Sequence, residues 1–206
     1  MENIFEVMAT RRSIRKYTDQ SVSDEDIKEI VAAAAAAPSA CNCQSYEFIA
    51  VRDKTKLNRL AELVCAFVDE FYAGADEALI VSRKKQMTFF TKAPVVIFVA
   101  EAPFVYHDAR VTEWYKSKGF SEEEMFADMG NPVSLTVGAA VENLLLAAHA
   151  KGLGACFMVD PVVAREKLEK ELNCKGHLAA VIPVGYPAYQ PREKTSKALD
   201  EILTIL

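Results

Sequence analysis

The chain has no excess of positive charge, because its 24 lysines and arginines are outnumbered by 29 aspartates and glutamates. A net charge of -5 argues against nucleic acid as the main partner. The first residues include Glu2 and have no long apolar core, so we expect neither a secretory signal nor a membrane anchor. The longest apolar stretches are too short or too interrupted to span a bilayer. These absences predict a cytoplasmic protein whose partners are neither nucleic acid nor membrane.

Cysteine is also scarce, with five residues in 206, an odd number that does not suit a disulfide framework in a chain of this length. Two of them, Cys41 and Cys43, stand one residue apart in the stretch "APSACNCQSYEF". Zinc sites commonly combine two pairs of ligands with about two to four residues inside each pair, and no second pair is present. Three interpretations stay open: a zinc-stabilised module, a redox-active thiol pair, and a polar loop beside which the thiols pack. The third is favoured, because nothing in the sequence indicates a lowered thiol pKa.

The hydrophobic pattern predicts strands that alternate with helices. Apolar residues at helical spacing follow the cap residues Asn3 and Ser23 and the turn at Asp53, which predicts three helices. Apolar, β-prone runs predict strands at 46–51, 95–100, 155–159 and 178–184, and the second of these is typical of a central strand covered on both faces. Asp160 and Pro161 would then be the N-cap and first residue of a further helix. Roughly five strands interleaved with helices predict one α/β or α+β domain over residues 1–206.

Two segments in the second half of the chain differ from this pattern. Residues 134–151 are apolar nearly all round and end before Gly152 as a C-cap, which predicts a buried helix, at a subunit interface if one exists. Between residues 101 and 132 the periodicity weakens while aromatic residues accumulate. We therefore expect a variable excursion or lid at about 101–132.

One cluster of cations stands out in this acidic chain. The run "RRSIRK", residues 11–16, combines four cations with a hydroxyl, and guanidinium groups beside a serine suit the oxygens of a phosphate. A solvated helix end is the alternative, since cations also complement the helix dipole. The "GLG" at 152–154 is no dinucleotide motif, because it leaves a helix and enters a strand. No nucleophile, acid/base pair or metal-ligand set is predicted, so any enzymatic activity would depend on a bound cofactor.

Five stretches in this order resemble the FMN-dependent nitroreductase family: "RRSIRKY", "APSACNCQSYEF", "APVVIFV", "AKGLGACFMV" and "VIPVGYPA". The resemblance covers essentially the whole chain. It implies an α+β nitroreductase-like fold with a central, mainly antiparallel sheet flanked by helices. It also implies an intertwined homodimer that holds two FMN molecules at its interface.

The resemblance also implies which residues bind the flavin. The phosphate and polar chain of FMN would be held in one subunit by Arg11, Arg12, Ser13 and Arg15, and Arg192 or Lys194 would complete this group. A loop from the other subunit would pack around the flavin with Pro38, Ser39, Ala40, Asn42 and Gln44. The backbone of Phe157, Met158 and Val159 would face the isoalloxazine ring. Cys41 and Cys43 are then neighbours of the functional residues.

The activity that the resemblance implies is a ping-pong reaction, in which NADH or NADPH reduces the flavin and a small-molecule acceptor reoxidises it. Nitroaromatic, quinone or similar electron-poor compounds are the expected acceptors. Rivals within the superfamily are a reductive dehalogenase and a flavin-fragmenting enzyme, and a rival outside it is a flavin-binding or redox-sensing protein that uses Cys41 and Cys43. Ser45 and Tyr46 stand where family members commonly have proline and tryptophan. Trp114, Tyr115 and Phe120 either stack on an aromatic acceptor or pack the excursion.

Overall fold

A four-stranded antiparallel sheet forms the centre of the computed structural model, which describes residues 3–104, 106 and 108–206. The strands of this sheet lie in the order β1-β2-β4-β3. Their bounds are Tyr46–Val51 for β1, Val95–Glu101 for β2, Gly154–Ala155 for β3 and His177–Gly185 for β4. Because β2 pairs with β1 on one side and β4 on the other, it is a central strand, as its continuous apolar sequence predicts.

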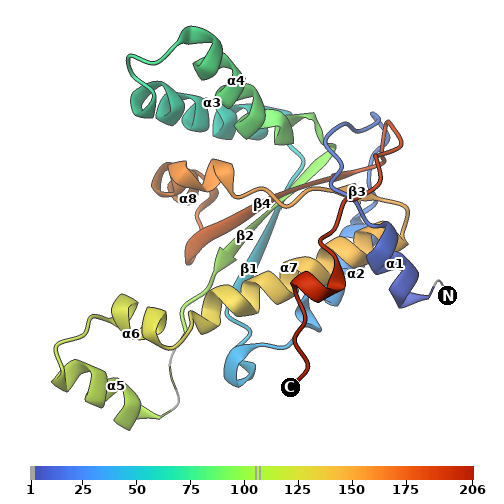
Figure 1. Cartoon of the computed structure of the whole chain (residues 1–206). Helices are drawn as coiled ribbons and strands as arrows, with labels where there is room; N and C mark the ends of the chain where they lie inside the picture. The colour runs from blue at the N-terminus through green and yellow to red at the C-terminus, as the bar shows by residue number, and fades with distance from the viewer. Residues whose placement is uncertain (1–2, 105, 107) are drawn as a thin grey trace.

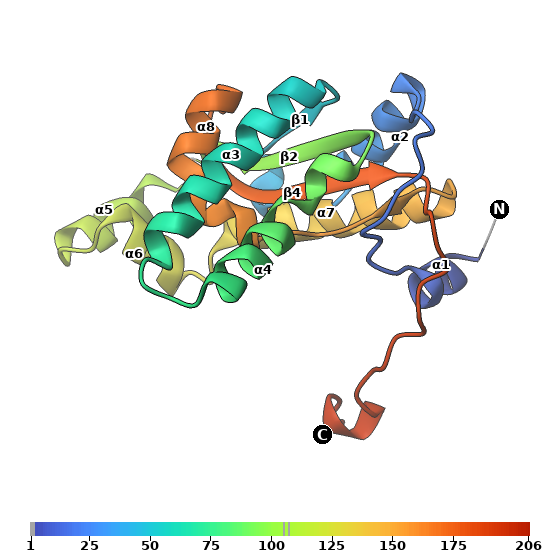
Figure 2. The same ribbon diagram turned by 90° about the horizontal axis from the view of Figure 1, so that it is seen from above.

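Helices cover both faces of the sheet (Figures 1 and 2). On one face lie α2 (Asp24–Ala35) and α7 (Pro132–Ala150), with α1 (Ile4–Thr10) against α7. On the other face lie α3 (Lys54–Phe71), α4 (Glu77–Thr88) and α8 (Arg165–Leu172). The predicted α+β fold with a central antiparallel sheet flanked by helices is therefore confirmed.

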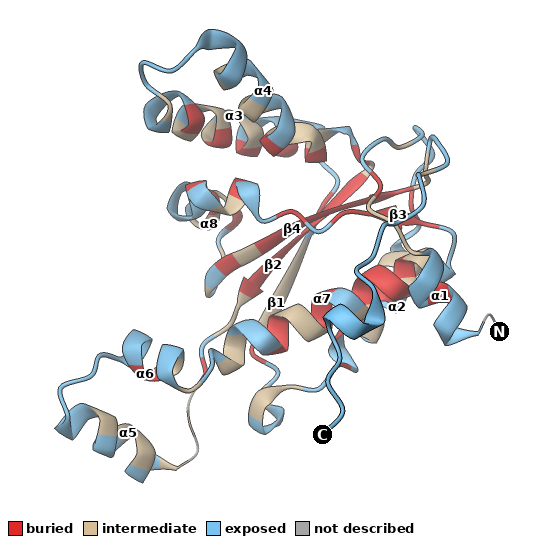
Figure 3. Ribbon diagram, in the orientation of Figure 1, coloured by how far each residue is buried: buried red, intermediate tan, exposed pale blue. Residues whose placement is uncertain are grey.

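The alternation of side chains along β2 creates two separate cores. Val95, Ile97 and Val99 point into the core shared with α2 and α7, whereas Val96 and Phe98 point into the core shared with α3 and α8. All five side chains are fully buried, and Figure 3 shows the buried positions concentrated on the strands and on the helix faces turned toward them. The sheet is thus the element on which both helical layers depend.

Hydrogen bonds at the helix ends confirm several predicted helix boundaries. Ser23 caps α2 by accepting from the N–H of Asp26 at 2.9 Å, and Asn3 caps α1 by accepting from the N–H of Phe5 at 3.1 Å. Gly152, with φ +73°, follows the end of α7 and donates its N–H to the carbonyl of His149 at 2.9 Å. The sequence signals for helix ends therefore act as expected at these three places.

The strand predicted at residues 155–159 is wrong in its extent. Only Gly154–Ala155 pairs as β3, and beyond it a single bridge joins Met158 to Val181. The prediction that Asp160 caps a helix is also wrong. A 3-10 turn spans Asp160–Ala164 without a side-chain cap, and the Asp160 carboxylate instead accepts from the amide nitrogen of Gln86 at 3.2 Å.

The long apolar helix α7 meets the length and composition of a membrane span, contrary to the sequence-based expectation that no stretch would. This is weak evidence for such a span, because core helices meet the same criteria, and eight of its residues are buried, six of them in the core shared with the sheet and α2. The prediction of burial holds for one face only. Leu135 on the other face is 69% exposed.

The excursion between β2 and α7 contains two helices, α5 (Ala109–Ser117) and α6 (Glu122–Asp128), that no prediction included. The sequence did carry a signal for α6, since Ser121 and Glu124 form a capping box. Val105 and His107, which also belong to the predicted excursion, lie outside the described residues. Figures 1 and 2 both show α5 and α6 at the end of the molecule opposite α1.

Replacing Gly176 with alanine should destabilise the fold, because a Cβ at this position would lie 1.7 Å from the carbonyl oxygen of Glu101. We expect the free energy of unfolding to fall by about 1–3 kcal/mol, as for other overpacked sites, in chemical denaturation. The matched control is Gly138→Ala inside α7, where a Cβ meets nothing within 4 Å and helix propensity favours alanine by about 0.5–1 kcal/mol. Equal effects of the two substitutions would contradict the close approach at Gly176.

Candidate functional site

Two segments that are far apart in the sequence meet around a cationic hollow of about 490 Å³. The segment after α1 pairs with β3, since the N–H of Ile14 donates to the carbonyl of Ala155 at 2.9 Å. The segment after β4 lies beside it, because the N–H of Ala188 donates to the carbonyl of Lys16 at 3.1 Å. The structure thereby brings together the predicted phosphate group, whose members are Arg11, Arg12, Ser13, Arg15, Arg192 and Lys194.

The cations of this hollow differ in their hydrogen-bond and ion-pair partners. The Arg12 guanidinium donates to the carbonyls of Ala9 and Arg11, both at 2.7 Å, and so satisfies acceptors at the end of α1. Arg11 lies 3.3 Å from a carboxylate oxygen of Glu142 on α7. Within the part of the chain that the structure describes, Arg15 and the two tail cations take part in no ion pair, and all three are exposed. These three are the cations most accessible to an anionic ligand.

The segment at 157–159 follows β3, which pairs with Ser13 at the hollow. It continues from Ala155, which forms a bridge with Ser13. Met158 is buried and pairs its backbone with Val181, whereas Phe157 and Val159 are 44% and 56% exposed. The alternation therefore turns two apolar side chains, two and four residues after Ala155, toward solvent.

The loop between α2 and β1 carries the other half of the predicted site in an uncommon backbone conformation. Cys41, Asn42 and Gln44 all have φ between +50° and +53°, a region that residues other than glycine rarely adopt. Two N–H groups of the loop donate to side-chain hydroxyls, that of Gln44 to Ser39 at 3.2 Å and that of Ala40 to Thr136 at 3.0 Å. Strained backbone of this kind concentrates at ligand-binding sites.

One chain does not bring the two halves together. Figure 1 shows the loop between α2 and β1 at one end of the molecule and the segment that follows α1 at another. Asn42 and Gln44 in the loop are exposed, as is Pro38. The cationic hollow and the strained loop are each preformed, but they are separate within the single chain.

Sequence reasoning missed two residues that shape these sites. Tyr189 lines the cationic hollow, and its hydroxyl lies 3.5 Å from the carbonyl oxygen of Ser13. Thr136 is 4% exposed and anchors the strained loop to α7. The sequence offered only weak signals for them, since a tyrosine in a Pro-rich tail and a threonine inside an apolar helix each have many structural roles.

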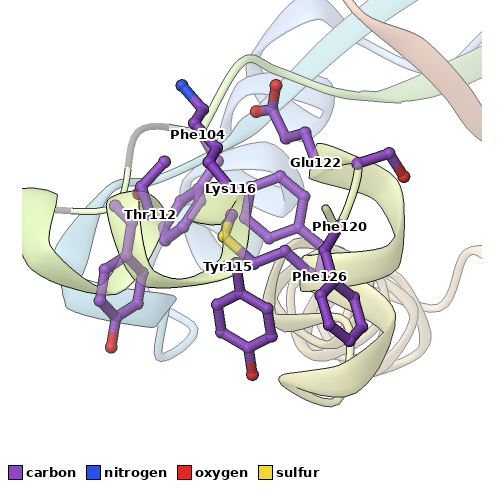
Figure 4. Close-up of a pocket in the computed structure, with 10 residues that line it drawn as sticks. Phe104, Thr112, Tyr115, Lys116, Phe120, Glu122 and Phe126 are labelled. Atoms are coloured by element: carbon purple, nitrogen blue, oxygen red, sulfur yellow. The ribbon is translucent and has the colours of Figure 1, made fainter. Parts of the chain in front are cut away.

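Aromatic residues of the excursion line part of a smaller, open pocket of about 160 Å³ (Figure 4). Tyr115 and Phe120 line this pocket, whereas Trp114 does not and is 55% exposed. The pocket therefore brings together two of the three aromatic residues that the sequence singled out.

The cysteines lie in different environments. Cys41 is exposed and Cys43 is half-buried, while Cys156 is buried. Burial raises the pKa of Cys156 above its ordinary value, although the charge of Arg15 opposes the shift. Among the described residues, no group of three or more His, Cys, Asp or Glu side chains is arranged to hold a metal ion.

The chain belongs to the Nitroreductase family, whose sequence profile matches residues 8–186. It is 31% identical to a protein of Archaeoglobus fulgidus assigned as an NADH dehydrogenase/NAD(P)H nitroreductase, over 91% of this chain and 87% of that one. It is 27% identical to an FMN reductase (NADPH) of Bacillus subtilis, over 91% of this chain and 67% of that one. It is 26% identical to an iodotyrosine deiodinase of Thermotoga neapolitana, over 91% and 90%.

Solved structures have the same fold. A BluB-like flavoprotein from Clostridium difficile 630 matches with a TM-score of 0.86 and 26% identity, over 100% of both chains. A nitroreductase with bound FMN from Bacteroides fragilis matches with a TM-score of 0.73 and 22% identity, again over 100% of both chains. The predicted nitroreductase-like fold is thereby confirmed.

The thiols should differ in how their alkylation depends on pH. Burial, together with the charges of Glu47 and Glu169, raises the pKa of Cys174 to about 11. Because only the thiolate reacts, its rate with iodoacetamide should rise about tenfold per pH unit from about pH 8 to about pH 10, as followed by mass spectrometry of peptides. In the unfolded protein the same rate should level off near pH 9. A rate that levels off equally early in the folded protein would contradict the assigned environment.

Proposed function

We propose that this protein is a cytoplasmic FMN-dependent oxidoreductase that takes electrons from NADH or NADPH and reduces nitroaromatic, quinone or similar electron-poor acceptors. The observation that carries the proposal is the meeting of the segment after α1 with the tail in one cationic hollow. Membership in the Nitroreductase family and the similarity to an FMN reductase and to a flavoprotein structure support the choice of cofactor.

The residues of the hollow fit the phosphate end of FMN. Guanidinium groups present paired donors that match phosphate oxygens, and Arg15 and Arg192 line the hollow without ion-pair partners among the described residues. Ser13 adds a hydroxyl, and Tyr189 adds a phenol beside it. Phe157 and Val159, which are exposed and follow Ala155 along the chain, are the apolar side chains that we propose face the flavin ring.

The chain's own residues would bind and orient the cofactor, and the cofactor would supply the redox chemistry. FMN, when bound, would supply the transfer of electrons from a reduced nicotinamide to an acceptor, which is chemistry that side chains lack. The cations would hold the phosphate in place while donor and acceptor bind in turn. We assign no side chain to proton transfer, which is consistent with a ping-pong reaction in which the cofactor does the chemistry.

The second half of the site would come from a second copy of the chain. This part of the proposal follows from the separation of the strained loop from the cationic hollow within one chain. Asn42 and Gln44 are exposed although their backbone is fixed in a costly conformation, which is what a loop that serves a neighbouring subunit requires. The partly exposed apolar face of α7, with Leu135, is a suitable contact surface for that copy.

A reductive dehalogenase is the second candidate, because the chain is similar over nearly its whole length to an iodotyrosine deiodinase. The two candidates share the cofactor and differ in the acceptor. With FMN and a reduced donor, release of iodide from an iodinated phenol at a higher kcat/KM than nitrobenzene reduction would favour the dehalogenase.

Removing two cations from the hollow should release the flavin. We expect the double substitution Arg15→Ala and Arg192→Ala to raise the Kd for FMN by about tenfold or more, because each lost charge-assisted hydrogen bond is costly, with binding followed by flavin fluorescence. Arg11 and Arg12 are unsuitable for this test, because they hold Glu142 and the end of α1.

The matched control removes two cations far from the hollow, Arg59→Ala and Lys85→Ala, and should leave the Kd for FMN unchanged. A double variant of Arg15 and Arg192 that purifies with the wild-type amount of flavin would overturn the assignment.

Mixing two variants that each impair one half of the site should restore activity, at FMN concentrations too low to saturate either variant, if the site is shared between subunits. One chain carries Arg15→Ala and Arg192→Ala, and the other carries Asn42→Ala and Gln44→Ala. After unfolding and refolding together, the mixed dimer has one site with all four native residues, so we expect about a quarter of the wild-type NADH- or NADPH-dependent turnover. Each variant refolded alone is the control. A mixture no more active than the two variants alone would show that the halves do not come from different chains.

A further inference from the structure

Thr136 is a polar residue at a buried position of the apolar helix α7. Its side chain is 4% exposed, and its neighbours on the buried face, Val137 and Ala140, are apolar. A buried hydroxyl costs stability unless it is hydrogen-bonded, and valine has nearly the same shape without that cost. The hydroxyl is therefore favourable at this position only if its hydrogen bonds offset its burial.

Both hydrogen-bonding functions of this hydroxyl are used. Its oxygen lies 2.8 Å from the carbonyl oxygen of Pro132, one turn earlier in α7, and 3.0 Å from the backbone nitrogen of Ala40. Because a carbonyl only accepts and a backbone N–H only donates, the hydroxyl donates its proton to Pro132 and accepts from Ala40. The bond inside the helix thus aims the oxygen lone pairs at the loop between α2 and β1.

The bond from Ala40 joins this loop to another element, whereas two further backbone bonds stay inside the loop. The N–H of Asn42 donates to the carbonyl of Ser39, and that of Cys43 donates to the carbonyl of Ala40, both at 3.0 Å. Internal bonds of this kind define the shape of the loop, but they do not fix where the loop lies relative to the rest of the chain. The bond to Thr136 does fix this place.

The helix that carries Thr136 is itself held on the central strand. The hydroxyl of Ser134 donates to the carboxylate of Glu101, the last residue of β2, at 2.6 Å. Val137 packs in the core that α7 shares with β2 and α2. A continuous series of contacts therefore runs from β2 through the first two turns of α7 to the loop.

We propose that Thr136 is a positioning residue for the flavin. By accepting from Ala40, it would place the loop so that Asn42 and Gln44 reach the FMN held by the other copy of the chain. This inference rests on the proposed function, which gives those two residues their role toward the flavin. Thr136 is buried and acts through the loop, so its loss should weaken FMN binding while the cations of the hollow stay in place.

Three variants separate the hydroxyl of Thr136 from the shape of its side chain. Thr136→Val keeps the shape and removes the hydroxyl, whereas Thr136→Ser keeps the hydroxyl on a smaller side chain. The matched control is Thr88→Val on α4, on the opposite face of the sheet. There a half-buried threonine hydroxyl donates to the carbonyl of Lys84 at 2.7 Å, so the control removes the same kind of bond inside a helix without touching the loop.

Two measurements on the full chain test the inference. Amide hydrogen exchange followed by NMR reports on the anchor, and Ala40 should exchange at least about threefold faster in Thr136→Val than in the wild type. Titration by flavin fluorescence reports on the consequence, and the Kd for FMN should rise about three- to tenfold in Thr136→Val, the size expected for one lost hydrogen bond. In Thr136→Ser and Thr88→Val both values should stay within about twofold of the wild type.

The outcomes distinguish this inference from the proposed function. Wild-type binding of FMN with an unchanged Kd in Thr136→Val, or an equal rise in Thr136→Val and Thr136→Ser, would overturn the positioning role alone. An unchanged exchange rate of Ala40 in Thr136→Val would show that the hydroxyl does not hold the loop, with the same result. A wild-type chain that takes up no FMN would instead overturn the proposed function, and the role of Thr136 toward the flavin with it.

Discussion

The pairing of β2 with both of its neighbours is the interaction on which the rest of the structure depends. Alternate side chains of β2 enter the two cores, so both helical layers pack against the same seven-residue strand. Loss of this strand would remove the surface for α7 and α8 together, because each layer gains most of its stability by burying apolar area on the sheet. The candidate sites lie at the margins of this platform, where the chain leaves the sheet.

The two halves of the proposed flavin site are fixed by different kinds of constraint. Backbone pairing of Ile14 with Ala155 places the cations, so their position follows from the sheet edge. The loop at 38–44 instead keeps a costly conformation because Thr136 and Ser39 satisfy its N–H groups. A shift of α7 would therefore move the loop through Thr136 and would also move Arg11 through Glu142, whereas Ile14 would follow the sheet edge.

Periodicity and cap residues predicted the central strand, its neighbours β1 and β4 and the first helices, because those features are local, whereas only the family resemblance implied that the sheet is antiparallel. The short extent of β3 was not predictable from the sequence. Phe157 and Val159 are apolar, as in a buried strand, and yet both are exposed to solvent. The helices α5 and α6 escaped prediction because α5 buries none of its residues and α6 buries only Met125, so neither sequence carries a clear apolar face. The meeting of Arg15 with Arg192 depends on tertiary contacts, and only the family resemblance anticipated it.

The two-residue strand β3 has a consequence for the behaviour of the protein in concentrated solution. A long unpaired strand at the margin of a sheet offers a row of donors and acceptors to which other chains can add. Here that margin is short and is already occupied by the segment after α1, through Ile14 and the bridge at Ser13. The arginine-bearing segment thus occupies the backbone groups at the β3 edge, and its positive charges oppose the approach of the same edge of a second copy.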